Sequence, residues 1–203
     1  MSFTDPIDAT GYDFESWIRF AFDHPVSDTP WYYAEETYYT CDPQTVIGYY
    51  TRLFRDPRRL LSQYDEARLE QGLWFAVGSQ LSERVWDADI PLHLRVECIE
   101  AMPLMFREFL IDHPLDTSCF MWWDMLRPFG ESPDPAIVST MSLALDQVLP
   151  LPSRHCQLSA LHGLGHLNHE SKERIIRSYL STNPDIDDEL RQYAEHAIAG
   201  TVL

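Results

Sequence analysis

The feature that most constrains the fold of this chain is a short segment near the C-terminus that occurs twice. Ala160–Gly165 (ALHGLG) aligns with Ala194–Ala199 (AEHAIA) at an offset of 34 residues, and in both copies small residues interrupt an apolar helical pattern. Repeats of about this length are typical of stacked helix pairs, in which small residues let one helix approach its neighbour. The repeat therefore predicts a helical array and, with it, an extended binding surface.

Periodic apolar residues predict helices along most of the chain. Apolar positions three and four residues apart recur between breaks that contain proline, glycine or aspartate, as in amphipathic helices. Pro103 falls inside one such segment and is expected to kink or split it. The segment Trp31–Tyr39 fits either a strand or a helix, and no convincing pair of alternating strands is found. The segments predicted as helices are 13–24, 43–55, 64–78, 91–113, 134–149, 153–165, 175–182 and 187–197. Asp134, Ser153 and Asp187 are expected to cap the helices that they precede.

The C-terminal part of the chain, from about residue 134 to 203, resembles HEAT repeats. The resemblance is carried by SALHGLGHL (Ser159–Leu167) and QYAEHAIAG (Gln192–Gly200), each of which closes a helix pair. Residues 43–130 match more loosely, and residues 1–42 show no resemblance. The resemblance implies antiparallel helix pairs stacked into a curved solenoid, with a concave face lined by the second helix of each pair. HEAT proteins mostly scaffold or bind other macromolecules, although a few are enzymes.

These observations predict a single all-α domain over residues 1–203. We expect a HEAT-like array of antiparallel helix pairs, an α-α superhelix of about eight helices, with residues 43–203 as its body. The acidic N-terminal segment, residues 1–42, is expected to cap one end of the array. Trp122 and Trp123 are expected in the core, one ring buried and the other half-buried at a helix interface.

The formal charge of the chain is −17, and it is distributed unevenly. The first 45 residues contain nine acidic residues and one arginine, so this segment carries −8. A field of this sign repels phosphate backbones and anionic lipid surfaces and attracts cationic partners. We therefore expect a basic protein as the partner, and neither nucleic acid nor membrane. The alternative is that the acidity serves solubility alone.

The cysteines and the N-terminus indicate a cytoplasmic protein with reduced thiols. Cys41, Cys98, Cys119 and Cys156 lie far apart and form no CxxC pair, so we expect mostly buried thiols. The N-terminus is polar and acidic, without the basic start and apolar run of a signal peptide. No stretch approaches the roughly 20 consecutive apolar residues that a membrane helix needs.

The acidic and aromatic stretch Trp31–Tyr39 (WYYAEETYY) is the predicted partner-binding surface. Tyrosine and tryptophan offer large rigid contact areas, and the neighbouring carboxylates suit arginine or lysine on a partner. The alternative is that the aromatic rings pack the N-terminal segment onto the array as a cap, with the glutamates left in solvent. The predicted binding residues are Trp31, Tyr32, Tyr33, Glu35, Glu36, Tyr38 and Tyr39.

A histidine cluster, His162, His166 and His169, is the best candidate for chemistry. On one helix the first two stand on the same face and the third follows three residues later, a spacing that can hold a divalent metal with Glu170 nearby. The HExxH motif is absent, and glycines weaken a helix as a ligand platform. The alternative is that the glycines serve packing and the histidines occupy polar helix ends. Similarity to deoxyhypusine hydroxylase, a HEAT-like enzyme that binds two irons through repeated His-Glu dipeptides, is limited to the single dipeptide at His169.

The sequence as a whole favours a non-catalytic protein-interaction module with an acidic surface that binds a basic protein. One concrete form is an immunity protein that neutralises a cationic toxin such as a nuclease. The first alternative is a metal-dependent enzyme that uses the His162, His166 and His169 cluster, and a further one is a structural subunit of a larger assembly. No nucleophile elbow or phosphate-binding loop is present, so we expect no cofactor and no catalytic residues. The pattern gives no indication of the oligomeric state.

Overall fold

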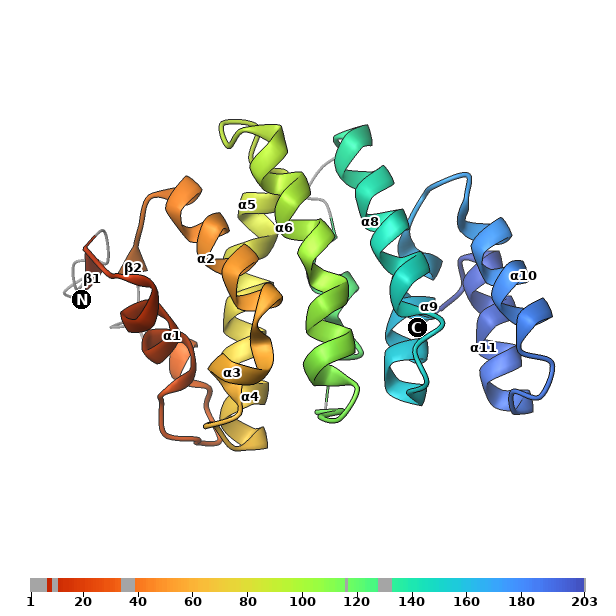
Figure 1. Cartoon of the computed structure of the whole chain (residues 1–203), viewed down its shortest axis with the longest axis horizontal. Helices are drawn as coiled ribbons and strands as arrows, with labels where there is room; N and C mark the ends of the chain where they lie inside the picture. Colours follow the sequence, from red (N-terminus) through yellow and green to blue (C-terminus); the bar gives the residue numbers. More distant parts are fainter. Residues whose placement is uncertain (1–6, 9–10, 34–38, 116, 128–132, 203) are drawn as a thin grey trace.

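The structure is a computed structural model that describes residues 7–8, 11–33, 39–115, 117–127 and 133–202, and its fold is all-α (Figure 1). The predicted fold class is thus confirmed. Two π-helical segments lengthen the helices: η3 (Trp74–Leu81) joins α4 to α5, and η4 (Phe106–Leu110) extends α6. The α-helices are α1 (Phe14–Phe22), α2 (Pro43–Arg55), α3 (Pro57–Leu61), α4 (Glu66–Leu73), α5 (Ser82–Trp86), α6 (Leu92–Met105), α7 (Trp122–Met125), α8 (Pro135–Val148), α9 (Arg154–His166), α10 (Lys172–Thr182) and α11 (Asp188–Ala199).

The helices form two layers. In Figure 1, α2, α6, α8 and α10 lie side by side, and α4, α9 and α11 lie behind them. The most extensive contacts of the first layer join α2 to α6 and α6 to α8, whereas in the second layer α9 packs against both α7 and α11. Helix α1 packs on α4 at the N-terminal end. Two layers let each amphipathic helix bury its apolar stripe. The finer prediction, antiparallel pairs in a HEAT-like superhelix, stays a prediction.

Short polar side chains fix where the helices begin. The predicted caps are confirmed: Ser153 and Asp187 accept hydrogen bonds from the backbone N–H groups of Cys156 and Leu190 at the starts of α9 and α11. Asp134 caps α8 in the same way, ahead of a proline at the first helical position. Its other carboxylate oxygen lies 3.3 Å from a guanidinium nitrogen of Arg95, a buried side chain of α6. This ion pair ties the start of α8 to the neighbouring helix.

Several helices extend differently from the prediction. The helix predicted to end at Gly78 runs on to Trp86, because η3 continues the backbone ladder with wider spacing. Pro103 lies inside α6 without ending it, and η4 follows three residues later. Pro57 begins a further short helix, α3, since proline is favourable at a first helical position. Short helices such as α3 and α7 were not among the eight predicted segments.

The ambiguous segment Trp31–Tyr39 is described at its two ends only, outside residues 34–38. Residues Trp31–Tyr33 form a 3-10 turn, and β2 (Tyr39–Thr40) pairs in parallel with β1 (Ile7–Asp8) over two residues. This ladder is too short to form an independent sheet. It holds Ile7 and Asp8 beside the residues that precede α2.

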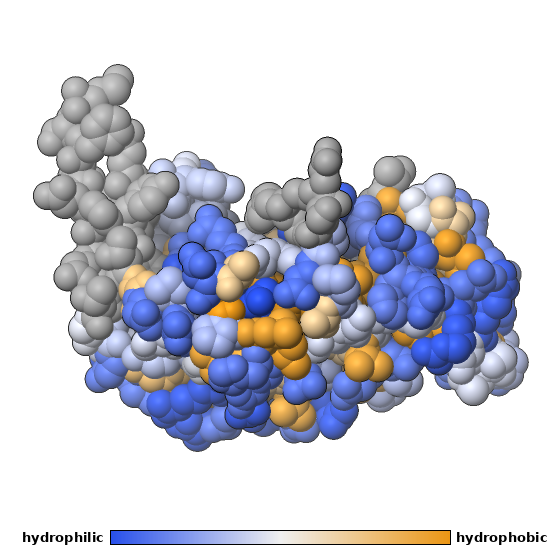
Figure 2. Space-filling model, turned by 90° about the horizontal axis from the view of Figure 1, so that it is seen from above, coloured by the Kyte–Doolittle hydropathy of each residue, from blue (hydrophilic) through white to orange (hydrophobic). Residues whose placement is uncertain are grey.

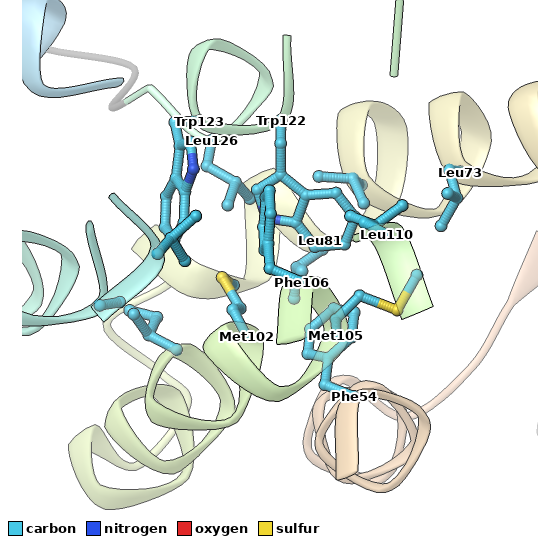
Figure 3. Close-up of a cluster of buried hydrophobic side chains, with 14 of the residues drawn as sticks. Phe54, Leu73, Leu81, Met102, Met105, Phe106, Leu110, Trp122, Trp123 and Leu126 are labelled. Atoms are coloured by element: carbon cyan, nitrogen blue, oxygen red, sulfur yellow. The ribbon is translucent and has the colours of Figure 1, made fainter. Parts of the chain in front are cut away.

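The core is rich in aromatic residues where α2, α6 and α7 meet (Figure 3). The ring of Trp122 lies 5.5 Å from that of Phe54 and 5.4 Å from that of Phe106, measured between centroids. Trp123 stacks on Phe106 at 5.8 Å and is also buried, so the expectation that one of the two tryptophans is only half-buried was wrong. Helix η4 supplies the ring that both tryptophans contact. All four cysteines are buried and free, as expected.

Small residues bring α9 close to its neighbours, as the repeat predicted. A Cβ atom added to Gly163 would lie 2.6 Å from Cβ of Trp123 and 2.9 Å from a methyl carbon of Leu145. A Cβ atom at Gly165 would lie 2.4 Å from a methyl carbon of Val202. Real Cβ atoms do not approach other carbons so closely. Both positions therefore require glycine because of packing rather than backbone conformation.

We expect Gly163→Ala to lower the free energy of unfolding by about 1–3 kcal/mol, the usual cost of overpacking. The atom that the new methyl group meets first is Cβ of Trp123, which cannot move without the α7 backbone. Urea denaturation of both proteins measures the difference. The control is Gly48→Ala, because Gly48 is an exposed residue of α2 with nothing within 4 Å of its added Cβ. That substitution should instead stabilise the protein by about 0.5–1 kcal/mol. Equal effects at the two positions would contradict the packing argument.

Glu70 of α4 anchors the loop that leads into α7. One carboxylate oxygen accepts hydrogen bonds from the backbone N–H groups of Thr117 and Ser118, both at 2.9 Å, and from the Thr117 hydroxyl at 2.7 Å. The indole N–H of Trp74 donates to the same oxygen at 3.0 Å, and the Ser118 hydroxyl donates to the other at 2.7 Å. Burial alone would raise the pKa of Glu70, but the donors from Ser118 and Thr117 outweigh it, and the pKa is lowered.

We expect Glu70→Gln to reduce the free energy of unfolding at pH 7 by about 1–3 kcal/mol, because an amide cannot accept all of these bonds. Since the pKa of Glu70 is lowered on folding, its contribution is complete above the unfolded value of 4.5 and is lost as the pH falls through the folded value. Denaturation at pH 7 and pH 3 measures this. The difference in free energy of unfolding between wild type and variant should be smaller at pH 3 than at pH 7. An equal difference at both pH values would contradict the role of the charged carboxylate.

Candidate functional site

Three potential metal ligands meet where α7 packs on α9. His162 and His166 lie one turn apart on α9, with ring centroids separated by 4.7 Å. Asp124 of α7 faces them, and its Oδ1 lies 3.6 Å from Nε2 of His166. One ligand atom from each of the three residues lies within 4.8 Å of the others. The predicted placement of the two histidines on one helix face is therefore observed, with a carboxylate that the sequence did not indicate.

His162 is the buried member of this group, with only 2% of its surface exposed. Its Nδ1 lies 2.8 Å from the hydroxyl of Tyr193 on α11, and its ring lies 4.4 Å from that of Phe120. Its Nε2 is buried and has no hydrogen-bond partner in the described part of the chain. Burial, and then the neighbouring charge of His166, lower the pKa of His162 to about 4. The imidazole is therefore neutral at pH 7, and its Nε2 carries a lone pair that no described residue satisfies.

His166 and Asp124 are partly exposed, and Arg127 lies beside them. Burial, followed by the charge of Arg127, lowers the pKa of His166 from its usual value. Arg127 donates a hydrogen bond of 2.8 Å to Oδ1 of Asp124, the same oxygen that faces His166. The carboxylate is thus shared between a guanidinium on one side and an imidazole on the other.

His169, the third predicted ligand, does not join the cluster. Helix α9 ends at His166, and its cap residue Leu167 has an extended backbone, so the helical spacing does not continue to residue 169. The Nδ1 of His169 accepts a hydrogen bond from the backbone N–H of Ser171 and lies 2.7 Å from its hydroxyl. Its Nε2 lies 3.4 Å from the hydroxyl of Ser139. Glu170 is exposed and belongs to this turn.

An apolar pocket of about 100 Å³ adjoins the cluster through His166. Its walls are mainly apolar side chains of α7, α8 and α9, with Trp86 at the end of α5, and Arg127 and Asn168 add polar groups. The pocket is large enough for a few water molecules or a small apolar group. The other lining residues are Trp123, Leu126, Pro133, Val138, Met141, Leu145, Gly163 and Leu167.

Among the predicted partner-binding residues, Trp31 and Tyr32 are partly buried and Tyr33 is exposed. Trp31 stacks on His24 at 3.7 Å between ring centroids and lies 4.6 Å from Phe75, and Tyr32 also lies against Phe75. Tyr33 is 71% exposed. Tyr39 pairs through its backbone in β2, and Glu35, Glu36 and Tyr38 lie outside the described residues. The capping alternative thus describes Trp31 and Tyr32, and Tyr33 alone of the described side chains offers an exposed ring.

Comparison with known proteins does not assign the site. Family models, curated proteins and solved structures were each searched, and none matches this chain. Within the described residues, no helix is both long enough and apolar enough to cross a membrane.

We expect the burial of neutral His162 to make folding stability fall as the pH drops from 6.5 to about 4. The unfolded chain binds a proton at His162 near pH 6.5, whereas the folded chain does not until about pH 4. At pH 5 the loss relative to pH 7 should be about 1–2 kcal/mol. Urea denaturation of wild type and His162→Gln at both pH values measures it, with His169→Gln as control. The first substitution should reduce this loss to the part contributed by His166, and the second should retain the whole of it. An imidazole NMR titration of His162 with a midpoint near 6.5 would contradict the prediction.

Proposed function

We propose that this protein is a non-catalytic interaction module, a HEAT-like helical array whose acidic surface binds a basic protein. The observation that carries this proposal is that most arginines are paired with carboxylates of the same molecule. Ten arginines form ion pairs with carboxylates inside the described part of the molecule, so few cations remain to balance the outer surface. The pairs are Arg52–Glu15, Arg55–Glu97, Arg58–Asp112, Arg59–Asp56, Arg68–Asp23, Arg84–Glu83, Arg95–Asp134, Arg127–Asp124, Arg154–Asp187 and Arg177–Glu173.

Many exposed carboxylates remain outside these pairs. The C-terminal end of the array has three of them, Asp185, Asp188 and Glu195, on α11 and the turn before it. The surface seen from above in Figure 2 is largely hydrophilic, with an apolar area near its middle. A negative surface with few unpaired cations attracts cationic proteins and speeds their association. The other exposed carboxylates without an ion pair to a described residue are Asp13, Asp28, Asp42, Glu66, Asp89, Glu100, Glu108, Asp146 and Glu170.

The second helix layer supports the same proposal. In HEAT-like arrays the second helix of each pair lines the binding face, and in this proposal α7, α9 and α11, which pack in sequence on one another, line it. This layer presents the partly exposed side chains of Phe120, Asp124, His166 and Tyr193. Aromatic rings beside carboxylates are suited to contact arginine and lysine. A cationic toxin such as a nuclease is one partner with this chemistry, and the protein would then act as its immunity protein.

The test is binding of the full chain to cationic proteins encoded by the genes beside its own. We expect one of them to bind, with an affinity that falls as the salt concentration rises from about 50 to 300 mM, because salt screens exposed charges. Isothermal titration calorimetry measures both. An unrelated basic ribonuclease serves as the control for unspecific attraction and should bind more weakly. Equal affinity for that control, or binding that is indifferent to salt, would contradict the proposal.

A pair of charge variants locates the surface. Asp185→Lys, Asp188→Lys and Glu195→Lys together change the C-terminal end, whereas Glu66→Lys, Asp89→Lys and Glu108→Lys make the same change of charge elsewhere. We expect the first triple variant to weaken binding more than the second, because the first alters a group close together on α11 and its preceding turn. Equal loss in both would mean that total charge, rather than this surface, determines binding.

A further inference from the structure

We propose that Asp124, His162 and His166 form a binding site for one divalent transition-metal ion of the zinc class. The inference is independent of partner binding and goes beyond it. Two imidazole nitrogens and one carboxylate oxygen suit zinc, cobalt or nickel, whereas calcium and magnesium prefer oxygen ligands alone. The three side chains come from two helices that the core holds together. His169 is excluded from the site because its nitrogens face serine side chains.

The separation of the donors is close to what a zinc-class ion requires. With metal–ligand bonds of about 2.0–2.1 Å, two donors of a tetrahedral site lie about 3.3 Å apart. The Nε2 of His166 and Oδ1 of Asp124 are already 3.6 Å apart. The full set of three ligand atoms lies within 4.8 Å, so small side-chain rotations bring all of them to one ion.

The buried nitrogen of His162 is the second observation that points to a ligand. Its Nε2 is buried without a hydrogen-bond partner among the described residues, and such a group is costly unless something satisfies it. The other nitrogen, Nδ1, lies 2.8 Å from the hydroxyl of Tyr193. Metal-binding histidines are typically held in this way, with one nitrogen on an outer partner and the other on the ion. Tyr193 is therefore a positioning residue, and Nε2 is the ligand atom.

The ligand set leaves room for a further group on the ion. Three protein ligands leave a fourth position open, as in zinc sites that bind water or an anion.

Arg127 competes with the ion for Asp124. Its guanidinium donates to Oδ1 of Asp124 at 2.8 Å, so the carboxylate is neutralised by arginine when no ion is bound. The side chain of Arg127 is 54% exposed and can move into solvent when the metal takes its place. This arrangement makes a distinctive prediction: removal of Arg127 should strengthen metal binding, whereas removal of any ligand should weaken it.

The test is titration of the full chain with zinc chloride and with cobalt chloride after treatment with a chelator. We expect one ion per chain, a rise in melting temperature, and the intense visible absorption of tetrahedral cobalt. His166→Gln and Asp124→Asn, both at partly exposed positions, should abolish the cobalt spectrum, and His162→Gln should do the same. Tyr193→Phe should weaken zinc binding by about 10–100-fold, as is typical of an outer partner. Arg127→Gln should strengthen it by up to about fivefold, the equivalent of an exposed ion pair.

Two controls make the outcome decisive. His169→Gln removes a histidine from the turn after α9, and His196→Gln removes one from α11. Both should leave the stoichiometry and the affinity of metal binding unchanged. Circular dichroism of the metal-free variants separates loss of binding from loss of folding. The proposal is overturned if folded His166→Gln retains wild-type affinity, if His169→Gln weakens binding as much as His166→Gln, or if wild type shows no saturable 1:1 binding.

Discussion

The close approach of α9 to α7 and α8 at Gly163 is the contact on which the C-terminal half of the molecule depends. With no side chain at this position, Trp123 and Leu145 reach the backbone of α9, and the aromatic core extends from one helix layer to the other. The residues next to this contact along each helix are His162 on α9 and Asp124 on α7. The packing that excludes a Cβ atom is therefore also what brings a histidine and a carboxylate together.

The ionisable groups of this protein lie in two different environments, the solvent-exposed surface and the buried α7–α9 contact. Most arginines pair with carboxylates, some on the same helix and others on neighbouring helices, and the exterior is left with a net negative charge. At the α7–α9 contact, by contrast, burial keeps His162 neutral and leaves one nitrogen without a hydrogen-bond partner among the described residues. Exposed charges act over a distance but are screened by salt, whereas a buried donor acts only on what reaches it. Attraction of a basic partner would depend on the exposed carboxylates, whereas metal binding would depend on the buried histidine. The two proposed functions use different groups and are compatible in one chain.

Local signals in the sequence were predicted well, and contacts between distant segments were not. The caps at Asp134, Ser153 and Asp187 were predicted because each acts on backbone groups two or three residues away. His162 and His166 were paired correctly because one helical turn joins them. His169 was predicted to join the other two histidines on one helix, which was wrong. The helix ends at His166 because the backbone of Leu167 is extended, so it does not reach residue 169. Asp124 was missed because it lies 38 residues before His162 and no periodic pattern links the two.

The sequence by itself determined the all-α class, the start of most helices, the negative charge and the need for small residues near Gly163. These properties depend on spacing, capping and composition, which act over a few residues or over the whole chain. Only the tertiary structure decided that Trp31 and Tyr32 pack inward, that Glu70 holds the loop before α7, and that Asp124 faces the two histidines. The physical reason is that such contacts depend on how two helices are placed side by side, and that placement is set by the complementary shapes of buried side chains rather than by the pattern of either helix alone.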